Sequence, residues 1–203
     1  MEFPDAETVD TALPEVTFPT FARVSYDPET PALDDVRGRT RDAVASLPLS
    51  GVPGGGTVAV GLGSRGIHDI RPIAETVITA LSAAGYEPVV IPAMGSHGGS
   101  TAEGQRRTLA ALGLTEDALG CRIDARMEAE VVGTTDRGHE VPVATAALEA
   151  DGIVVVNRVK PHTNFSGRVE SGLSKMLTVG LGKRAGARAF HEAALTHGYV
   201  DTI

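Results

Sequence analysis

The sequence predicts an α/β fold, a mainly parallel sheet with helices on both faces, and three observations support it. Short apolar runs alternate along the chain with segments in which apolar residues recur every three or four positions. The runs are rich in Val and Ile and apolar throughout, which is typical of parallel strands buried on both faces. Polar, Gly-rich turns follow these runs, as expected where ligands bind at the carboxyl ends of strands. The predicted architecture is therefore Rossmann-like.

The N-terminal residues are predicted to lie outside this fold. Residues 1–19 are acidic, contain proline and show no periodicity, so we expect a tail or an extension, with the domain covering residues 20–203. Residues 21–26 (FARVSY) alternate like a short strand, and residues 34–47 have the pattern of a polar helix. The segment 50–56 (SGVPGGG) holds too much glycine for a helix and is a predicted loop.

A βαβ unit is the clearest pattern in the chain. Residues 57–62 (TVAVGL) form a β-branched run, residues 69–84 have helical apolar spacing, and residues 88–93 (PVVIPA) form the next strand. A capping-box pattern from Ser100 to Glu103 then opens a helix that ends at Gly113. The remaining elements follow in order: a small β-hairpin over 131–144, a buried strand at 152–156 (GIVVV) and a mostly helical segment over 170–199.

Composition excludes several classes of function. A net charge of −8 and a pI near 5.2 argue against nucleic acid or an anionic membrane as the main partner. A single Cys excludes a disulfide framework and Cys-rich metal modules. No apolar run approaches the ~18 residues of a membrane span, and the acidic N-terminus is unlike a signal peptide, so we expect a cytoplasmic protein. The chain has only three lysines, Lys160, Lys175 and Lys183, all within one stretch.

The turn at residues 61–69 carries a glycine pattern. Gly61-x-Gly63-x-x-Gly66 stands between a strand and a helix, where a helix N-terminus can hold a dinucleotide pyrophosphate. The acidic residue expected at the end of the following strand is absent, since that strand ends in Ala93 and Met94. An NAD(P)-dependent oxidoreductase built on this turn is therefore one alternative, and a tight glycine turn without a ligand is another.

The other strand-end turns hold histidines. His97 in GSHGGST (95–101) lies just ahead of a predicted helix N-terminus, whose positive dipole disfavours the imidazolium form and suits a neutral base. His162 follows Pro161, which fixes the backbone where the chain leaves the sheet. Lys175 and His191 lie too far apart for one helical face, so a turn within residues 180–186 is needed to bring them together. Taken singly, each of these residues also has a purely structural reading.

In this order and at these intervals, Arg65, His97, His162, Lys175 and His191 resemble the nickel-dependent lactate racemase family. The resemblance spans about residues 20–200, which correspond to the N-terminal, cofactor-carrying domain of that family. Gly-Ser-His97-Gly resembles the family's Gly-Thr-His turn, and Pro-His162 with the following Phe-Ser-Gly resembles the segment of its second catalytic histidine. The separation between Lys175 and His191 is the most specific feature.

This resemblance implies a racemase or epimerase of 2-hydroxy acids such as lactate. The reaction would run by hydride transfer to a covalently tethered nickel-pincer nucleotide, a pyridinium bis-thiocarboxylate mononucleotide with nickel. By resemblance, Lys175 would carry the nucleotide through a thioamide and His191 would coordinate the nickel. His97 and His162 would be the acid/base groups, and Arg65 would orient the substrate carboxylate.

The sequence departs from the family pattern in places. His97 is followed by two glycines instead of the family's usual Arg-Pro, and the interval from His162 to Lys175 is a few residues longer. An Arg-Pro pair does occur at Arg71, which leaves Arg71 as a second candidate beside Arg65 for the substrate arginine.

The resemblance also implies the partners. These are a small 2-hydroxy acid and a C-terminal domain of the same protein that would complete the active site. A non-catalytic domain that keeps this scaffold for ligand binding is the remaining hypothesis.

Overall fold

The computed structural model describes residues 5, 7–8, 11, 20–25, 32–64, 66–162 and 165–202. The chain divides into two units, Met1–Leu33 and Asp34–Ile203, and the second contains the predicted sheet. Residues 20–25 have no regular secondary structure, so the strand predicted over 21–26 is wrong where the chain is described. A start of the domain at residue 20 stays a prediction.

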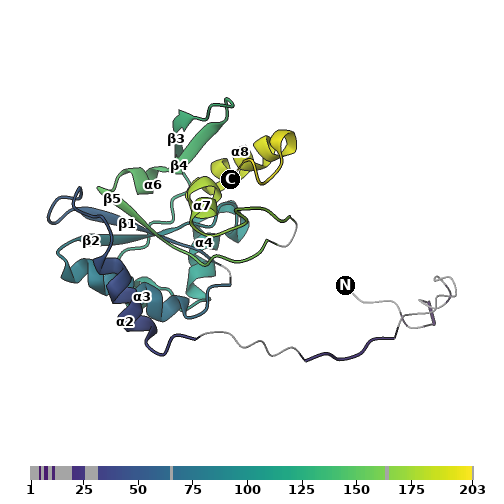
Figure 1. Ribbon diagram of the computed structural model, residues 1–203, viewed down its shortest axis with the longest axis horizontal. Helices are drawn as coiled ribbons and strands as arrows, with labels where there is room; N and C mark the ends of the chain where they lie inside the picture. The colour runs from purple at the N-terminus through teal and green to yellow at the C-terminus, as the bar shows by residue number, and fades with distance from the viewer. Residues whose placement is uncertain are drawn as a thin grey trace. The chain divides into compact units, whose positions relative to one another are not determined.

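A three-stranded parallel sheet forms the centre of the second unit (Figure 1). Its order is β2-β1-β5, and the strands are β1 Thr57–Leu62, β2 Glu87–Pro92 and β5 Gly152–Val156. Leu62 of β1 pairs with Pro92 of β2 and with Val156 of β5. The three strands therefore end at one level, and the turns that follow them meet at one edge of the sheet.

Helices cover both faces of this sheet, as the sequence predicts. On one face, Val58, Val60 and Leu62 of β1 pack into a core with residues of the helices before and between the strands. These helices are α2 Val36–Ala45, α3 Ile70–Ala83, α4 Ala102–Ala110 and α5 Glu116–Leu119. On the other face, the smaller Ala59 lets α6 Thr145–Leu148 and η2 Met176–Gly180 approach closely. Figure 1 shows α3 and α6 on opposite sides of the strands.

The C-terminal half adds a hairpin and a long helix. The hairpin consists of β3 Ala129–Thr134 and β4 Glu140–Ala144, which confirms the prediction over 131–144. The predicted helical segment is built from α7 Leu173–Lys175, η2 and α8 Lys183–His197, and α8 packs against β4 and η2. The break between η2 and α8 lies at Leu181 and Gly182, inside the turn region that the sequence requires.

One helix start differs from the prediction by a residue. The N-cap of α4 is Thr101, whose hydroxyl accepts a hydrogen bond from the Gly104 N–H at 3.0 Å. Ser100, the predicted cap, instead has a φ of 57° and closes the short η1 turn Gly98–Ser100. In the parts of the chain that the structure describes, no helix is both long enough and apolar enough to cross a membrane.

Candidate active site

Two neighbouring cavities lie where the strands end. The larger measures about 340 Å³ and is lined by residues after all three strands, including Ser64 after β1, His97 after β2 and His162 after β5. The smaller measures about 170 Å³. Both are lined by Met94, His97, His162, Lys175 and Val179. His191 lines the smaller cavity, so the structure brings together four of the residues that the sequence singles out.

His97 is held in a turn that only glycine can make tightly. Gly95 has a φ of 58°, and a Cβ there would lie 3.2 Å from both Cγ1 and the carbonyl oxygen of Val179. The Gly95 N–H donates to the Gly180 carbonyl at 3.1 Å, which ties the turn to η2. The ring of His97 is oriented separately, because its Nδ1 lies 2.8 Å from Ser64 Oγ.

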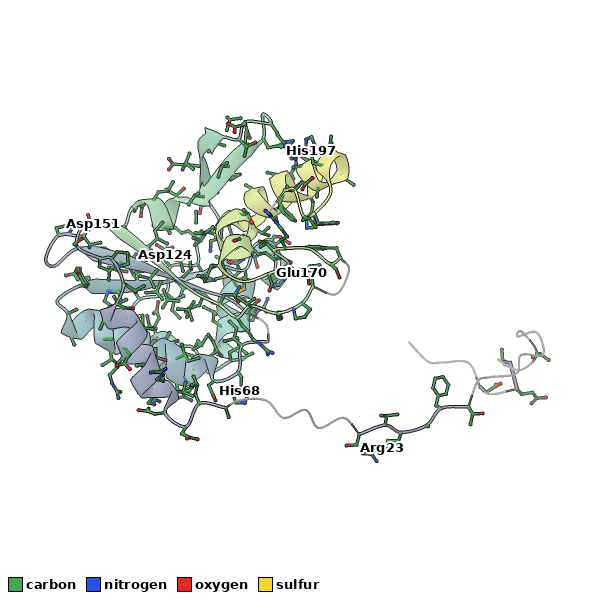
Figure 2. All side chains as sticks on the ribbon, in the orientation of Figure 1. Arg23, His68, Asp124, Asp151, Glu170 and His197 are labelled. Carbon is green, nitrogen blue, oxygen red and sulfur yellow. The ribbon has the colours of Figure 1, made fainter. Side chains whose placement is uncertain are left out.

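His162 lies on a loop that a carboxylate closes. Glu170, labelled in Figure 2, accepts the backbone N–H of His162 at 2.7 Å and that of Gly167 at 2.8 Å. These two hydrogen bonds hold the pKa of Glu170 below its usual range. Burial lowers the pKa of His162, and the Lys175 ammonium lowers it further. The neutral imidazole, the form that can accept a proton, is therefore favoured.

Lys175 reaches the same cavities because the chain doubles back after β5. Asn157 Nδ2 donates to the Gly172 carbonyl at 3.1 Å, and the Lys160 N–H donates to Ser171 Oγ at 2.7 Å. These bonds place the start of α7 beside the end of β5. Burial, followed by the charge of Lys160, lowers the pKa of Lys175. A larger fraction of neutral, nucleophilic amine results than for an exposed lysine.

His191 enters the site from α8 within an aromatic cluster. Its ring centroid lies 6.1 Å from that of Tyr199 and 5.6 Å from that of Phe190, both edge to face. Tyr199 also stacks on Phe165 at 5.1 Å, and Phe165 lies 4.3 Å from the ring of His162. The cluster thus joins the helix of His191 to the loop of His162 and gives the smaller cavity an apolar wall.

The larger cavity is cationic. Arg158, Lys160 and Lys175 line it, and none of its described lining residues is acidic. Arg158 also donates to the Gly66 carbonyl at 3.0 Å, which links the turn after β1 to the segment after β5. A cavity of this charge suits an anionic ligand such as a carboxylate or a phosphate.

The protein alone does not form a complete metal site in the described ranges. No three His, Cys, Asp or Glu side chains there come together in a way that could hold a metal ion.

Of the two candidates for the substrate arginine, the structure describes only Arg71. Arg65 lies outside the described residues. Arg71 forms an ion pair on α3, where its Nε lies 2.8 Å from Glu75 Oε1.

The glycine pattern of residues 61–66 does not make a dinucleotide turn. Gly61 belongs to β1, and α3 begins only at Ile70, four positions beyond Gly66. A Cβ on Gly63 would lie 3.0 Å from Asn157 Oδ1, so this glycine permits a close approach between neighbouring strand ends. The helix N-terminus thus does not follow the glycines directly, as pyrophosphate binding by this motif requires.

Sequence reasoning missed the residues that support the site. Ser64 and Gln105 carry no signal of their own, and only their hydrogen bonds to the His97 ring and to the Gly95 carbonyl identify them. The sequence leaves Glu170 open between a supporting partner and a surface charge, and the hydrogen bond from the His162 N–H shows that it supports that loop. Lys183 belongs to the lysine cluster but lies fully buried beneath the site. The clustering of the three lysines was the only sequence signal for Lys183.

Comparison with known proteins identifies a family. A family model described as lactate racemase N-terminal domain matches residues 64–202, which include His97, His162, Lys175 and His191. No curated protein matches the chain.

Proposed function

Because the chain belongs to the family of lactate racemase N-terminal domains, we propose that it acts in racemising or epimerising 2-hydroxy acids, with a nickel-pincer nucleotide tethered to Lys175. One observation carries the proposal. His97, His162 and Lys175 line both cavities at the carboxyl edge of the sheet. His191 lines the smaller of the two beside them. The reaction proposed here uses two imidazoles as acid/base groups, an amine to carry the nucleotide and a further imidazole to bind the metal.

The residues present fit the proposed group. The larger cavity falls within the ~300–1,000 Å³ range of small-molecule sites. The lowered pKa of Lys175 favours the neutral amine that forms an acyl-type bond. His191, which lines the smaller cavity, would hold the nickel, and its imidazole is a natural ligand for Ni(II).

Proton transfer is the task of the two histidines. When bound, the group supplies hydride acceptor and donor chemistry, and the protein supplies position and protons. A 2-hydroxy acid loses a proton from its hydroxyl as the hydride leaves its carbon, and both must return to complete racemisation. We assign His97 and His162 to accept and return that proton, one for each enantiomer, since a neutral imidazole titrates near physiological pH.

Substrate binding rests on the cationic character of the site. Arg158 and Lys160 offer charges for the substrate carboxylate or the nucleotide phosphate. Arg65 is assigned to orient the substrate carboxylate on the basis of the family resemblance.

Intact mass and metal content test this function. The protein, produced together with the enzymes that make the cofactor, should carry a covalent adduct and nickel, and Lys175→Ala should lose both. Arg188→Gln, which removes an exposed ion pair to Glu192 on α8, should keep the adduct and the nickel and is the control. An unmodified wild-type chain without nickel would refute the proposal and favour a non-catalytic domain. Nicotinamide binding by calorimetry that Gly63→Val weakens and Lys175→Ala leaves unchanged would instead favour the oxidoreductase.

A further inference from the structure

A buried lysine lies beneath the His97 turn. Lys183 is the first residue of α8 and is 0% exposed, the largest of the fully buried side chains in the described part of the chain. Its backbone φ of 53° lies in the left-handed region, which is uncommon for a residue other than glycine. Burial of an ammonium group is costly unless the charge is compensated.

Hydrogen bonds compensate this charge. Lys183 Nζ donates to the carbonyl of Pro92, the last residue of β2, at 2.9 Å and to Gln105 Oε1 at 3.1 Å. Gln105 lies on α4, is also 0% exposed and is the only glutamine in the chain. The carboxylates of Asp124 and Glu128 add a weaker favourable charge interaction.

The lysine sets the orientation of the glutamine amide. An ammonium group can only donate, so the atom of Gln105 that faces Lys183 must be the carbonyl oxygen. The amide nitrogen of Gln105 therefore points the other way. It donates to the Gly95 carbonyl at 2.8 Å and to the His97 carbonyl at a longer 3.4 Å. Lys183 and Gln105 thus connect α8 to the end of β2 at Pro92 and to the turn from Gly95 to His97.

We propose that Lys183 and Gln105 are positioning residues that hold the backbone of His97 in its working orientation. The role as an aid to catalysis rests on the proposed function, in which His97 exchanges a proton with the substrate. Because Lys183 and His191 share α8, the same pair of residues ties the helix of the proposed metal ligand to the turn of the proposed base.

Ring orientation and backbone orientation of His97 are thereby set by different residues. Ser64 acts on Nδ1 of the ring, whereas Gln105 acts on the carbonyls of Gly95 and His97. A methionine at position 183 would fill a similar volume without the burial cost. It would, however, leave Gln105 Oε1 and the Pro92 carbonyl without this donor, and the amide of Gln105 would lose its preferred orientation.

Gln105→Glu is the sharpest variant. A glutamate still accepts from Lys183, but it replaces the amide donor that faces the Gly95 carbonyl with a second oxygen. In the cofactor-free protein labelled with ¹⁵N-histidine, we expect the imidazole resonances of His97 to shift or broaden while those of the exposed His68 stay in place. Lys183→Met should act on His97 in the same way. Arg188→Gln removes an exposed ion pair to Glu192 on α8 and should leave the His97 resonances unchanged.

Kinetics of the cofactor-loaded protein provide a second readout. Gln105→Glu should lower kcat roughly ten- to a hundredfold, the loss expected from a misplaced catalytic group, with little change in KM or in adduct and nickel content. Unchanged His97 resonances in Gln105→Glu and Lys183→Met would overturn the proposal. The spectra need no cofactor, so this result is independent of whether the nickel nucleotide binds.

The wild-type protein gives a test that does not depend on a variant folding. Its single glutamine contributes one side-chain amide pair, which should exchange slowly with water and show coupling across the hydrogen bond to the Gly95 carbonyl. Rapid exchange of that amide would also overturn the proposal.

Discussion

Ser64 Oγ and His97 Nδ1 lie 2.8 Å apart although the two residues are separated by 33 positions in the chain. Ser64 belongs to the turn after β1 and His97 to the turn after β2, so the bond spans two adjacent strand ends. The parallel register makes this contact possible, because Leu62 and Pro92 end their strands opposite each other. The ring of a candidate base is therefore oriented by a residue from a different strand.

Removal of the Ser64 hydroxyl should impair proton transfer. We expect Ser64→Ala to lower kcat about fivefold, since a hydrogen bond of this kind contributes ~1 kcal/mol, with a smaller change in KM. Steady-state racemisation assays with each enantiomer measure the effect. Ser46→Ala, which removes an exposed hydroxyl at the end of α2, is the control and should behave as wild type. A change confined to KM would contradict the orienting role.

Alanine substitutions at Gly95 and Gly99 separate two contributions to stability, the packing against Val179 and the backbone strain of a positive φ. Gly95 and Gly99 have similar φ values of 58° and 66°, so alanine at either position should cost ~1–2 kcal/mol from backbone strain. Only Gly95→Ala also forces a Cβ to within 3.2 Å of Val179, whereas a Cβ at Gly99 meets nothing within 4 Å. Gly95→Ala should therefore lower the free energy of unfolding more than Gly99→Ala in urea denaturation. Equal losses would show that the contact with Val179 is relieved without cost.

Burial of Lys183 should make stability depend on pH in the alkaline range. Burial lowers the pKa of Lys183 to about 8, whereas in the unfolded chain it is ~10.4. Between these two values the unfolded chain binds more protons than the folded one, so the free energy of unfolding rises with pH. Below pH ~8 both states are protonated and this contribution is flat. The difference in unfolding free energy between wild type and Lys183→Met, followed from pH 7 to 10, should rise in favour of wild type. A flat difference through pH 10 would contradict the shift.

Acidification should release the His162 loop. The backbone hydrogen bonds from His162 and Gly167 lower the pKa of Glu170 below its unfolded value of ~4.3. The ionised carboxylate therefore stabilises the loop above that value, and the stabilisation is lost as pH falls through the lower, folded pKa. The amide resonances of His162 and Gly167 should titrate below pH ~4.3 in wild type and not in Glu170→Gln. Glu87→Gln, at the opposite end of β2, should leave this titration unchanged.

Local patterns predicted the elements well where a single segment carries the signal. The continuous apolar run over 152–156 is β5 residue for residue, and the helical spacing over 69–84 corresponds to α3 within a residue at each end. Ser100 and Thr101 are both good N-cap residues, and only the backbone of the η1 turn selects Thr101. The FARVSY alternation predicted a strand, but a strand also needs a neighbour to pair with, and alternation alone does not provide one.

The sequence by itself determined the alternation of strands and helices, the turns at the strand ends and the family to which those turns belong. The elements and turns follow from spacing along short segments, where backbone geometry and burial act locally, and the family follows from the order and intervals of five residues from Arg65 to His191. The tertiary structure decided which residues work together, such as Lys183 with Gln105 and Ser64 with His97. Those contacts depend on how separate elements pack and on which polar groups are left to satisfy one another away from water. No local pattern encodes that outcome, because it arises only when the segments share one buried volume.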